Sequence, residues 1–324
     1  MLSLTHRPYA GETDLEAIVE LINTCDEVDR TDSSTTVAGL RRSIESPTQD
    51  KARDFALWHD RQNQLIGYAR LWIPESGDDI AGSLWFCVRP HNRDGSIESE
   101  MVDWAQAQIR EVARERGIRV KLHSECRDTQ TERQAFLEGC GFTRVRYFFT
   151  MARSLSEPIP TPKFPEGFRV QKSQVRQNTQ AYVEMFNQSF IDHWDFSPLT
   201  VEELEYFSGK PTYRPELDLV AISPDGTFAA FCFAEIDPEE NQRYDRNEGV
   251  IEVLGTRRGF RQRGLGRAML LSGLQGLREA GVETAKLGVD SQNPSGALRL
   301  YESVGFDRVE TWMTYAKVVD RANS

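Results

Sequence analysis

The chain has 324 residues and a formal net charge of −11, with 50 acidic against 39 basic side chains. This length suggests about two domains, and the acidic balance argues against nucleic acid as a general partner. No run of about 18 apolar residues is present, so no membrane span is expected. The first residues lack the basic and apolar segments of a signal peptide, so none is expected either.

The five cysteines form no Cys-x-x-Cys pair, and the five histidines are scattered through the chain. A structural zinc site is therefore not expected, and we predict no metal. This use of cysteine is typical of a reducing compartment, so we predict the cytoplasm as the location.

The first half shows the elements of an α/β domain. Apolar residues recur first at helical spacing, then in alternation, and then at helical spacing again,. The stretch 83–93 (SLWFCVRPHNR) precedes the second helical segment, and the half closes on 135–142, AFLEGCGF. The expected elements are a helix at 14–25, strands at 55–58 and 65–72, a helix at 101–113 that Gly117 ends, and a strand at 120–123.

The stretch 154–167, SLSEPIPTPKFPEG, predicts an extended connector. Four prolines fall within eight residues, and proline lacks a backbone N–H and disrupts both helices and central strands. We therefore predict a first domain at 1–153, a linker at 154–165 and a second domain at 166–324.

The second half repeats the order of the first. A helix at 178–190 precedes strands at 217–222 and 227–236, and RLYESVGF at 299–306 matches AFLEGCGF, with the same Gly-Phe ending. A repeat of about 165 residues indicates two copies of one α/β domain.

Residues 253–267, VLGTRRGFRQRGLGR, predict a strand that runs into a turn and then a helix. No Lys-Ser or Lys-Thr follows the glycines, so the turn is not a Walker A loop. Glycines allow close approach of a ligand, and the free amides of a helix start suit a phosphate or pyrophosphate. Five arginines within eleven residues reverse the acidic charge of the chain at this place.

The helix after the turn repeats Leu270, Leu274 and Leu277, and Gly281 can end it,. A strand at 284–289 follows. Asn293-Pro294 then predicts a helix start, with Asn293 as N-cap; this helix carries Tyr301, and a last strand covers 309–318.

The stretch 250–318 resembles the GNAT superfamily of N-acetyltransferases. Three pieces match in order and spacing: the RQRGLG turn, the VDSQNPSGALRLYE segment and the VGF that ends it. The resemblance implies the fold class α/β (α+β), with two tandem GNAT-like domains, each a mixed, mostly antiparallel sheet flanked by helices. The two-copy layout is also similar to that of mycothiol synthases, whose acceptor is a cysteinyl sugar.

The resemblance also implies acetyl-CoA as the acetyl donor and assigns residues to it. The pantetheine arm would pair with the backbone of Val253, Leu254, Gly255 and Thr256. The pyrophosphate would lie over the turn, and Asn293 would contact the pantetheine. The residues of the turn are Arg261, Gln262, Arg263, Gly264, Leu265, Gly266 and Arg267.

Acetyl transfer to an amine needs a neutral amine, a polarised thioester and a proton for the leaving thiolate. The resemblance makes Tyr301 the general acid, although its periodicity alone fits a core aromatic equally well. Glu252 stands inside an apolar strand, where a carboxylate is costly unless it faces a cleft or a partner,. Facing a cleft, it could accept the amine proton through water or hold a cationic substrate, and we predict the role of base. A strand Glu bonded to a neighbouring Arg is the alternative.

The segment 187–197, NQSFIDHWDFS, follows the first helix of the second half. In GNAT proteins this region commonly borders the acceptor site. Asp192, His193 and Trp194 could recognise an amine by charge and by cation–π contact, or they could form a loop that covers the core.

The first half departs from the family pattern. Aligning Pro90 with Arg258 puts Ser96 at the place of Gly264 and Glu98 at that of Gly266. A carboxylate there repels phosphate and favours a helix start without a ligand. Aligning the Gly-Phe endings puts Leu137 at the place of Tyr301. We therefore expect residues 1–153 to be a degenerate, non-catalytic scaffold.

The predicted function is an acetyl-CoA-dependent N-acetyltransferase that acts on a primary amine of a small molecule by direct transfer. A mycothiol-synthase-like activity and an aminoglycoside or peptide amine as acceptor stay open. A non-catalytic acyl-CoA-binding module is the alternative from another class. We expect no nucleic acid or membrane partner, and a monomer or homodimer.

Overall fold

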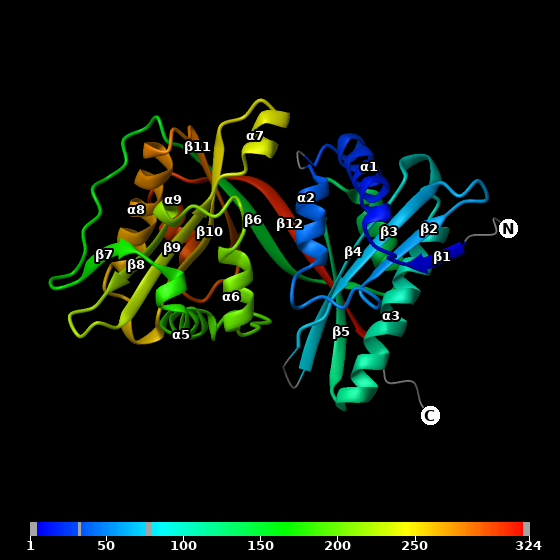
Figure 1. Cartoon of the computed structure of the whole chain (residues 1–324), viewed down its shortest axis with the longest axis horizontal. Helices are drawn as coiled ribbons and strands as arrows, with labels where there is room; N and C mark the ends of the chain where they lie inside the picture. Colours follow the sequence, from blue (N-terminus) through cyan, green and yellow to red (C-terminus); the bar gives the residue numbers. More distant parts are fainter. Residues whose placement is uncertain (1–4, 32–33, 76–78, 320–324) are drawn as a thin grey trace. The chain divides into compact units, whose positions relative to one another are not determined.

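A computed structural model describes residues 5–31, 34–75 and 79–319 of the chain (Figure 1). The chain divides into two compact units. Unit 1 comprises residues up to Arg146 together with the segment from Trp312, and unit 2 runs from Tyr147 to Thr311. Each unit has its own buried core, and the strands of each unit are described by themselves.

In unit 1 the strands follow the order β1-β2-β3-β4-β5-β12. Neighbouring strands are antiparallel, except that β4 and β5 are parallel. The elements are β1 (Thr5–Pro8), α1 (Glu12–Asp29), α2 (Val37–Ile44), β2 (Phe55–His59), β3 (Leu65–Trp72), β4 (Asp79–Val88), η1 (Pro90–Asn92), α3 (Ser96–Arg116), β5 (Arg119–Arg127) and α4 (Thr131–Gly139).

In unit 2 the strands follow the order β7-β8-β9-β10-β11-β6, and only β10 and β11 are parallel. The elements are β7 (Arg169–Lys172), η2 (Val175–Gln177), α5 (Thr179–Phe190), α6 (Val201–Ser208), η3 (Pro215–Leu217), β8 (Asp218–Ile222), β9 (Phe228–Glu235), α7 (Pro238–Arg243), β10 (Glu248–Thr256), η4 (Arg258–Phe260), α8 (Leu265–Glu279), β11 (Thr284–Asp290) and α9 (Ala297–Glu302). The predicted fold class, mixed and mostly antiparallel sheets with flanking helices, is confirmed.

The two halves of the sequence exchange their last strands. Strand β6 (Thr143–Ser154) comes from the first half of the chain, and its residues 148–154 pair with β11 of unit 2. Strand β12 (Asp307–Val319) comes from the second half, and its residues 312–319 pair with β5 of unit 1. Spatial division therefore differs from a cut of the sequence at residue 153. The proline-rich residues 158–165 form neither helix nor strand.

Alternation along the strands of unit 2 builds a core on each face of the sheet. Cys232 and Ile251 face α8, where Leu270, Leu274 and Leu277 are fully buried as their helical spacing predicts. Phe231 points to the opposite face, against α5. Burial of each such leucine contributes about 2 kcal/mol, so these faces hold β10 and the start of α8 in place.

The predicted helix start at Asn293 is wrong. Helix α9 begins at Ala297, and Gly296, in the left-handed conformation with φ 75°, precedes it. The Asn293 Oδ1 instead accepts the backbone N–H of Ser295 at 2.8 Å, which closes a tight turn ahead of the helix. Asparagine caps turns as readily as helices, and this competition decided the boundary.

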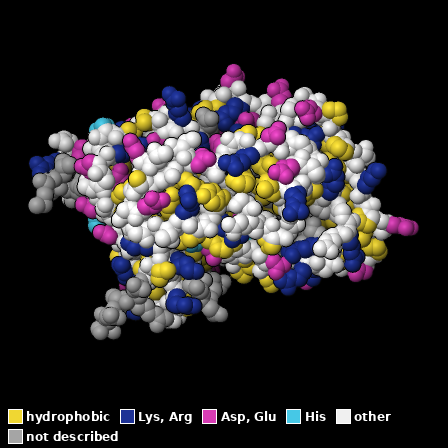
Figure 2. Space-filling model, turned by 180° about the vertical axis from the view of Figure 1, so that it is seen from behind, with side chains coloured by type: hydrophobic (Ala, Val, Ile, Leu, Met, Phe, Trp, Pro, Cys, Tyr) yellow, Lys and Arg dark blue, Asp and Glu magenta, His cyan; other side chains and the backbone are white. Residues whose placement is uncertain are grey.

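The surface carries both signs of charge. Figure 2 shows acidic and basic side chains interspersed over the face that it presents. None of the helices within the described ranges is long and apolar enough to cross a bilayer.

Candidate active site

Strands β10 and β11 separate partway along their length. They pair from Glu248 to Ile251, opposite Thr284 to Leu287, and the pairing ends there. Residues 253–256, which we predicted to hold the pantetheine arm, are paired only with β9 on the other side. In this fully described stretch the edge facing β11 is therefore open, except that Arg261 Nε donates to the Thr256 carbonyl at 3.3 Å. An open strand edge can pair with an extended ligand.

A β-bulge lies at the point where the strands separate. Ile251 pairs with Ala234 and Val253 with Phe233, so Glu252 is the additional residue on β10. A bulge redirects a side chain and is common beside active sites. The sequence pattern predicted an unusual Glu at this position but not the bulge.

The Glu252 side chain is exposed to solvent, although protein atoms surround it densely. The surrounding protein atoms therefore leave this carboxylate poorly solvated. Burial, together with the nearby Glu235 carboxylate, raises the pKa of Glu252 to about 7, and Lys210 opposes the shift,. A carboxylate with this pKa can take up a proton near neutral pH.

The turn before α8 presents unused amides. Gln262 and Gly264 both have positive φ angles, 61° and 84°, which turn the chain sharply into the helix. Residues 262–267 are all described, and none of their backbone N–H groups donates to a protein acceptor. A Cβ atom added at Gly266 would have ordinary contacts, the nearest with Thr256 Oγ1 at 3.4 Å. The absence of a side chain at Gly266 therefore leaves space beside the amides rather than meeting a packing need.

Two arginines of this region are held by one aspartate. Arg258 forms an ion pair with Asp192, and Arg261 Nη1 lies 2.7 Å from the same carboxylate. These guanidinium groups, Arg258 first, lower the pKa of Asp192 to about 2. Arg263 stacks on the Phe260 ring, and Arg267 donates to the Ser303 hydroxyl. Among the described residues, no carboxylate forms an ion pair with Arg263 or Arg267. Their positive charge is therefore available to an anion.

The segment that we predicted to border the acceptor lies beside this turn. Asp192 already balances two arginines, which makes it a poor partner for an ammonium group. The His193 ring packs edge-on against Phe190 at 4.6 Å, and Trp194 lies 6.3 Å from Phe148. A role of His193 and Trp194 in acceptor binding stays a prediction.

Tyr301 lies on α9 next to the start of α8. A methyl group at Gly266 would be 3.7 Å from Leu300, its neighbour in the helix. Tyr301 is 7% exposed, and its hydroxyl forms no hydrogen bond with the described residues. Burial, with a contribution from Cys232, raises the pKa of Tyr301 well above 10, so the phenol keeps its proton and can donate it.

The corresponding turn of unit 1 is closed by its own side chains. Gly95, with φ 87°, precedes α3 as Gly264 precedes α8, so this turn is one residue shorter and our alignment of Ser96 with Gly264 is displaced by one. Ile97, rather than Glu98, then stands at the place of Gly266. The Gly95 amide donates to Glu98 at 3.1 Å and the Ser96 amide to Asp94 at 2.9 Å, which uses the amides that an anion would need.

The end of α4 matches the end of α9. The Phe142 amide donates to the Leu137 carbonyl and the Phe306 amide to the Tyr301 carbonyl, each at 3.1 Å, so Leu137 does stand at the place of Tyr301. One turn earlier, Arg133 matches Ala297. Its Nη1 donates to the Phe86 carbonyl on β4 at 3.0 Å, and this side chain occupies the edge that is open in unit 2. Sequence comparison missed this residue because α4 alone does not show where Arg133 points.

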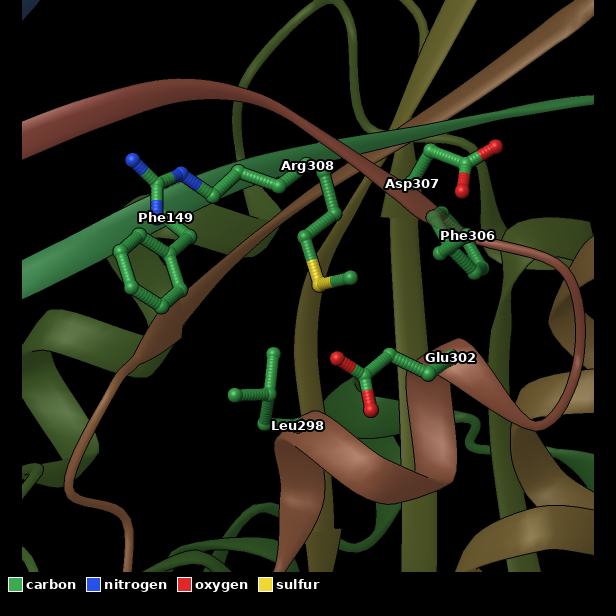
Figure 3. A pocket seen from close by; sticks show the side chains of 7 residues that line it. Phe149, Leu298, Glu302, Phe306, Asp307 and Arg308 are labelled. Atoms are coloured by element: carbon green, nitrogen blue, oxygen red, sulfur yellow. The ribbon is translucent and has the colours of Figure 1, made fainter.

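A pocket of about 180 Å³ lies beside α9 in unit 2 (Figure 3). Figure 3 shows the Glu302 carboxylate directed into it, one turn from Leu298. The Arg308 guanidinium lies over the Phe149 ring at 4.3 Å. Phe306 lines the pocket and also packs against Tyr301, so the pocket adjoins the proposed acid. Its lining residues are Phe149, Met151, Leu298, Glu302, Phe306, Asp307 and Arg308.

Residues 179–306 match the family model described as "Acetyltransferase (GNAT) family". The match identifies a GNAT acetyltransferase domain within unit 2. The match covers the open edge of β10, the turn and α9, so the predicted family and an acyltransferase activity are confirmed.

Relatives and solved structures extend the likeness to the whole chain. A mycothiol acetyltransferase of Thermobispora bispora is 29% identical over 309 residues, which cover 94% of this chain and 97% of the relative. One of Nocardiopsis dassonvillei is 33% identical over 172 residues, 53% of this chain and 52% of the relative. A GCN5-related N-acetyltransferase from Sphaerobacter thermophilus has a TM-score of 0.74 at 23% identity, covering 98% and 96%. A tandem GNAT protein from the clavulanic acid biosynthesis pathway has a TM-score of 0.69 at 13% identity, covering 99% and 100%.

Proposed function

We propose that unit 2 transfers the acetyl group of acetyl-CoA directly to a primary amine of a small molecule. One observation carries this proposal: the open edge of β10 leads to the bare helix start of α8, and Tyr301 stands on the helix packed beside it. An extended thioester with a pyrophosphate needs both an unpaired strand edge and an anion site.

The residues of unit 2 would divide the work in binding. Residues 253–256 offer backbone groups to the pantetheine arm, and an amide near the bulge can polarise the thioester carbonyl. The amides of 262–267, with Arg263 and Arg267, receive the pyrophosphate. Asn293 is kept as a proposed contact of the pantetheine, although its Oδ1 accepts from Ser295, so only its amide N–H₂ is available.

Tyr301 and Glu252 supply the acid and the base in this proposal. Glu252 has a pKa of about 7, so near neutral pH its carboxylate can accept the amine proton, directly or through water. The Tyr301 phenol can donate its proton to the thiolate that leaves. Their opposite protonation states at neutral pH are those that direct transfer requires.

The acceptor side favours a cation. Glu235 lies close enough to Glu252 to raise its pKa, and the Glu235 carboxylate accepts a hydrogen bond from Thr212 at 2.6 Å. Neighbouring carboxylates attract an ammonium group and weaken binding of an acidic acceptor. The names of the full-length relatives favour a mycothiol-synthase-like reaction on a cysteinyl sugar, while an aminoglycoside or peptide amine stays the alternative.

The remaining roles follow from these assignments. We propose that unit 1 is a scaffold without a cofactor of its own, that the enzyme works in the cytoplasm, and that it acts as a monomer or homodimer without nucleic acid or membrane partners. The buried free cysteines, Cys25, Cys87, Cys126 and Cys232, support a reducing compartment.

The test is thiol release from acetyl-CoA over a panel of amines, with the alcohol analogue of each amine as its matched control. We expect release with at least one amine, a product heavier by one acetyl group, and no release with the alcohols. Tight binding of acetyl-CoA without transfer to any amine would instead favour a non-catalytic acyl-CoA-binding module.

A further inference from the structure

Two cysteines of unit 1 lie side by side in its core. Cys25 is on α1 and Cys87 is on β4, and their exposed fractions are 3% and 6%. The Cys25 thiol donates to the Val88 carbonyl at 3.3 Å. Val88 directly follows Cys87, and both cysteines belong to the same cluster of packed core residues, so their side chains are neighbours.

Unit 2 has the same local arrangement without cysteines. Matching ion pairs show which residues of the two units are equivalent. The pair of Arg89 with Glu20 in unit 1 matches the pair of Arg257 with Glu184 in unit 2, since both join the helix to the end of the strand. Counting five residues on from each glutamate makes Ser189 the equivalent of Cys25.

The strand partner is aligned in the same way. Tyr68 pairs with Cys87 as Phe231 pairs with Gly255. A Cβ placed on Gly255 would be 3.0 Å from the Cβ of Ser189. A disulfide needs a Cβ–Cβ separation of about 3.5–4.5 Å, so the backbone of this fold brings the two positions close enough for one.

A cation activates one thiol of the pair. Arg93 Nε donates at 2.8 Å to the Val88 carbonyl that also accepts from Cys25. The neighbouring Cys87 side chain, and after it Arg93, lowers the pKa of Cys25 against the effect of burial, whereas burial raises the pKa of Cys87. Asp29 pairs with Arg93 at 2.5 Å and moderates its charge. Thiolate character therefore concentrates on Cys25.

We propose that Cys25 and Cys87 form a dithiol that hydrogen peroxide oxidises to an intramolecular disulfide. The Cys25 thiolate attacks one peroxide oxygen, the O–O bond breaks, and protonation of the leaving oxygen gives water and a sulfenic acid on Cys25. The Cys87 sulfur then attacks the Cys25 sulfur, the S–O bond breaks, and a second water leaves. Two thiols are oxidised and one peroxide is reduced to two waters.

The test uses the full chain, reduced and then exposed to a small excess of hydrogen peroxide, followed by alkylation and peptide mapping. We expect the loss of two of the five thiols and a Cys25–Cys87 disulfide peptide. Cys87→Ser should instead leave a sulfenic acid on Cys25 that dimedone labels. Cys25→Ser, which copies the serine of unit 2, should abolish the two-thiol loss.

Cys140→Ser is the matched control, because Cys140 is the partly exposed cysteine of unit 1. This variant should form the disulfide at the rate of the wild-type chain. Oxidation of Cys140 in the wild-type chain without any Cys25–Cys87 peptide would overturn the proposal. That outcome is read from the unmutated protein, so it does not depend on the folding of a variant.

Discussion

Tyr301 is proposed as the general acid because no described group forms a hydrogen bond with its hydroxyl, and because burial keeps it protonated. Tyr301→Phe keeps the ring and its contact with Phe306, so we expect kcat to fall by about 10²-fold with little change in acetyl-CoA affinity. Steady-state kinetics and calorimetry on the same preparation measure both.

Tyr182→Phe is the control for loss of a phenol. Tyr182 is buried in the same unit, but its hydroxyl donates to Asp218 at 3.3 Å. We expect this change to lower the free energy of unfolding by about 1 kcal/mol and to leave kcat nearly unchanged. If Tyr301→Phe behaves like Tyr182→Phe, Tyr301 is a core residue and the thiolate leaves by another route.

Glu252 makes a prediction about pH. A base must be deprotonated, so kcat/KM should fall as the pH decreases below about 7, the pKa of Glu252. Glu252→Gln should lower kcat/KM at pH 8 by about 10²-fold and remove that limb of the profile. A pH profile of Glu252→Gln with the same inflection near 7 would assign the inflection to another group.

Stability gives an independent measure of Glu252. Folding raises the pKa of Glu252 from 4.5 to about 7. Between pH 4.5 and pH 7 the folded state therefore binds more protons than the unfolded state. The unfavourable contribution of its charge is absent below about pH 4.5 and complete above about pH 7. Glu252→Gln should therefore raise Tm at pH 8 and leave it unchanged at pH 4. A lower Tm at pH 8 would contradict the raised pKa.

At the scale of one element, the two glycines of the turn before α8 have different roles. Gly264 has a left-handed φ of 84°, so any side chain there strains the backbone by about 1 kcal/mol. Gly266 has room for a Cβ atom. We expect Gly266→Glu to fold normally and to abolish measurable acetyl-CoA binding by calorimetry, because a carboxylate would then stand among the free amides.

Gly266→Ala is the matched control for this turn. Its methyl group would lie 3.4 Å from Thr256 Oγ1 and 3.7 Å from Leu300, which are ordinary contacts, and it adds no charge. Its affinity should lie between those of the wild type and Gly266→Glu. Unchanged affinity of Gly266→Glu would show that the phosphates bind elsewhere.

At the scale of the whole molecule, the turn and the strand edge that are open in unit 2 are occupied in unit 1. In unit 1, Glu98 and Asp94 take the amides of the turn and Arg133 occupies the edge of β4. We predict that each chain binds one acetyl-CoA, in unit 2, at saturation. Titration calorimetry measures the stoichiometry.

Two variants of unit 1 sharpen this prediction. Glu98→Gln keeps an acceptor for the Gly95 amide, and Arg133→Ala opens the edge but leaves the amides capped. Neither should change the stoichiometry or the acetyltransferase activity. Two acetyl-CoA molecules per wild-type chain would show that the turn of unit 1 still binds phosphate.

Local pattern was enough for several features of this protein. Leu270, Leu274 and Leu277 predicted the buried face of α8, and the RQRGLG turn predicted a helix start with free amides. The Gly-Phe endings alone predicted that Leu137 is the equivalent of Tyr301 in the first half. These features depend on residues that are close in sequence, where spacing directly determines which side chains share a face.

Only the tertiary structure decided the rest. The exchange of β6 and β12, the bulge at Glu252 and the open edge of β10 depend on which strands pair, and pairing partners are far apart in sequence. Asp192, which could recognise an amine on the sequence alone, lies against Arg258 and Arg261, two residues that are distant from it in the sequence. Arg133 closes unit 1 because α4 is folded back onto β4. The sequence determines the charge of a side chain, whereas long-range packing determines which group that side chain contacts.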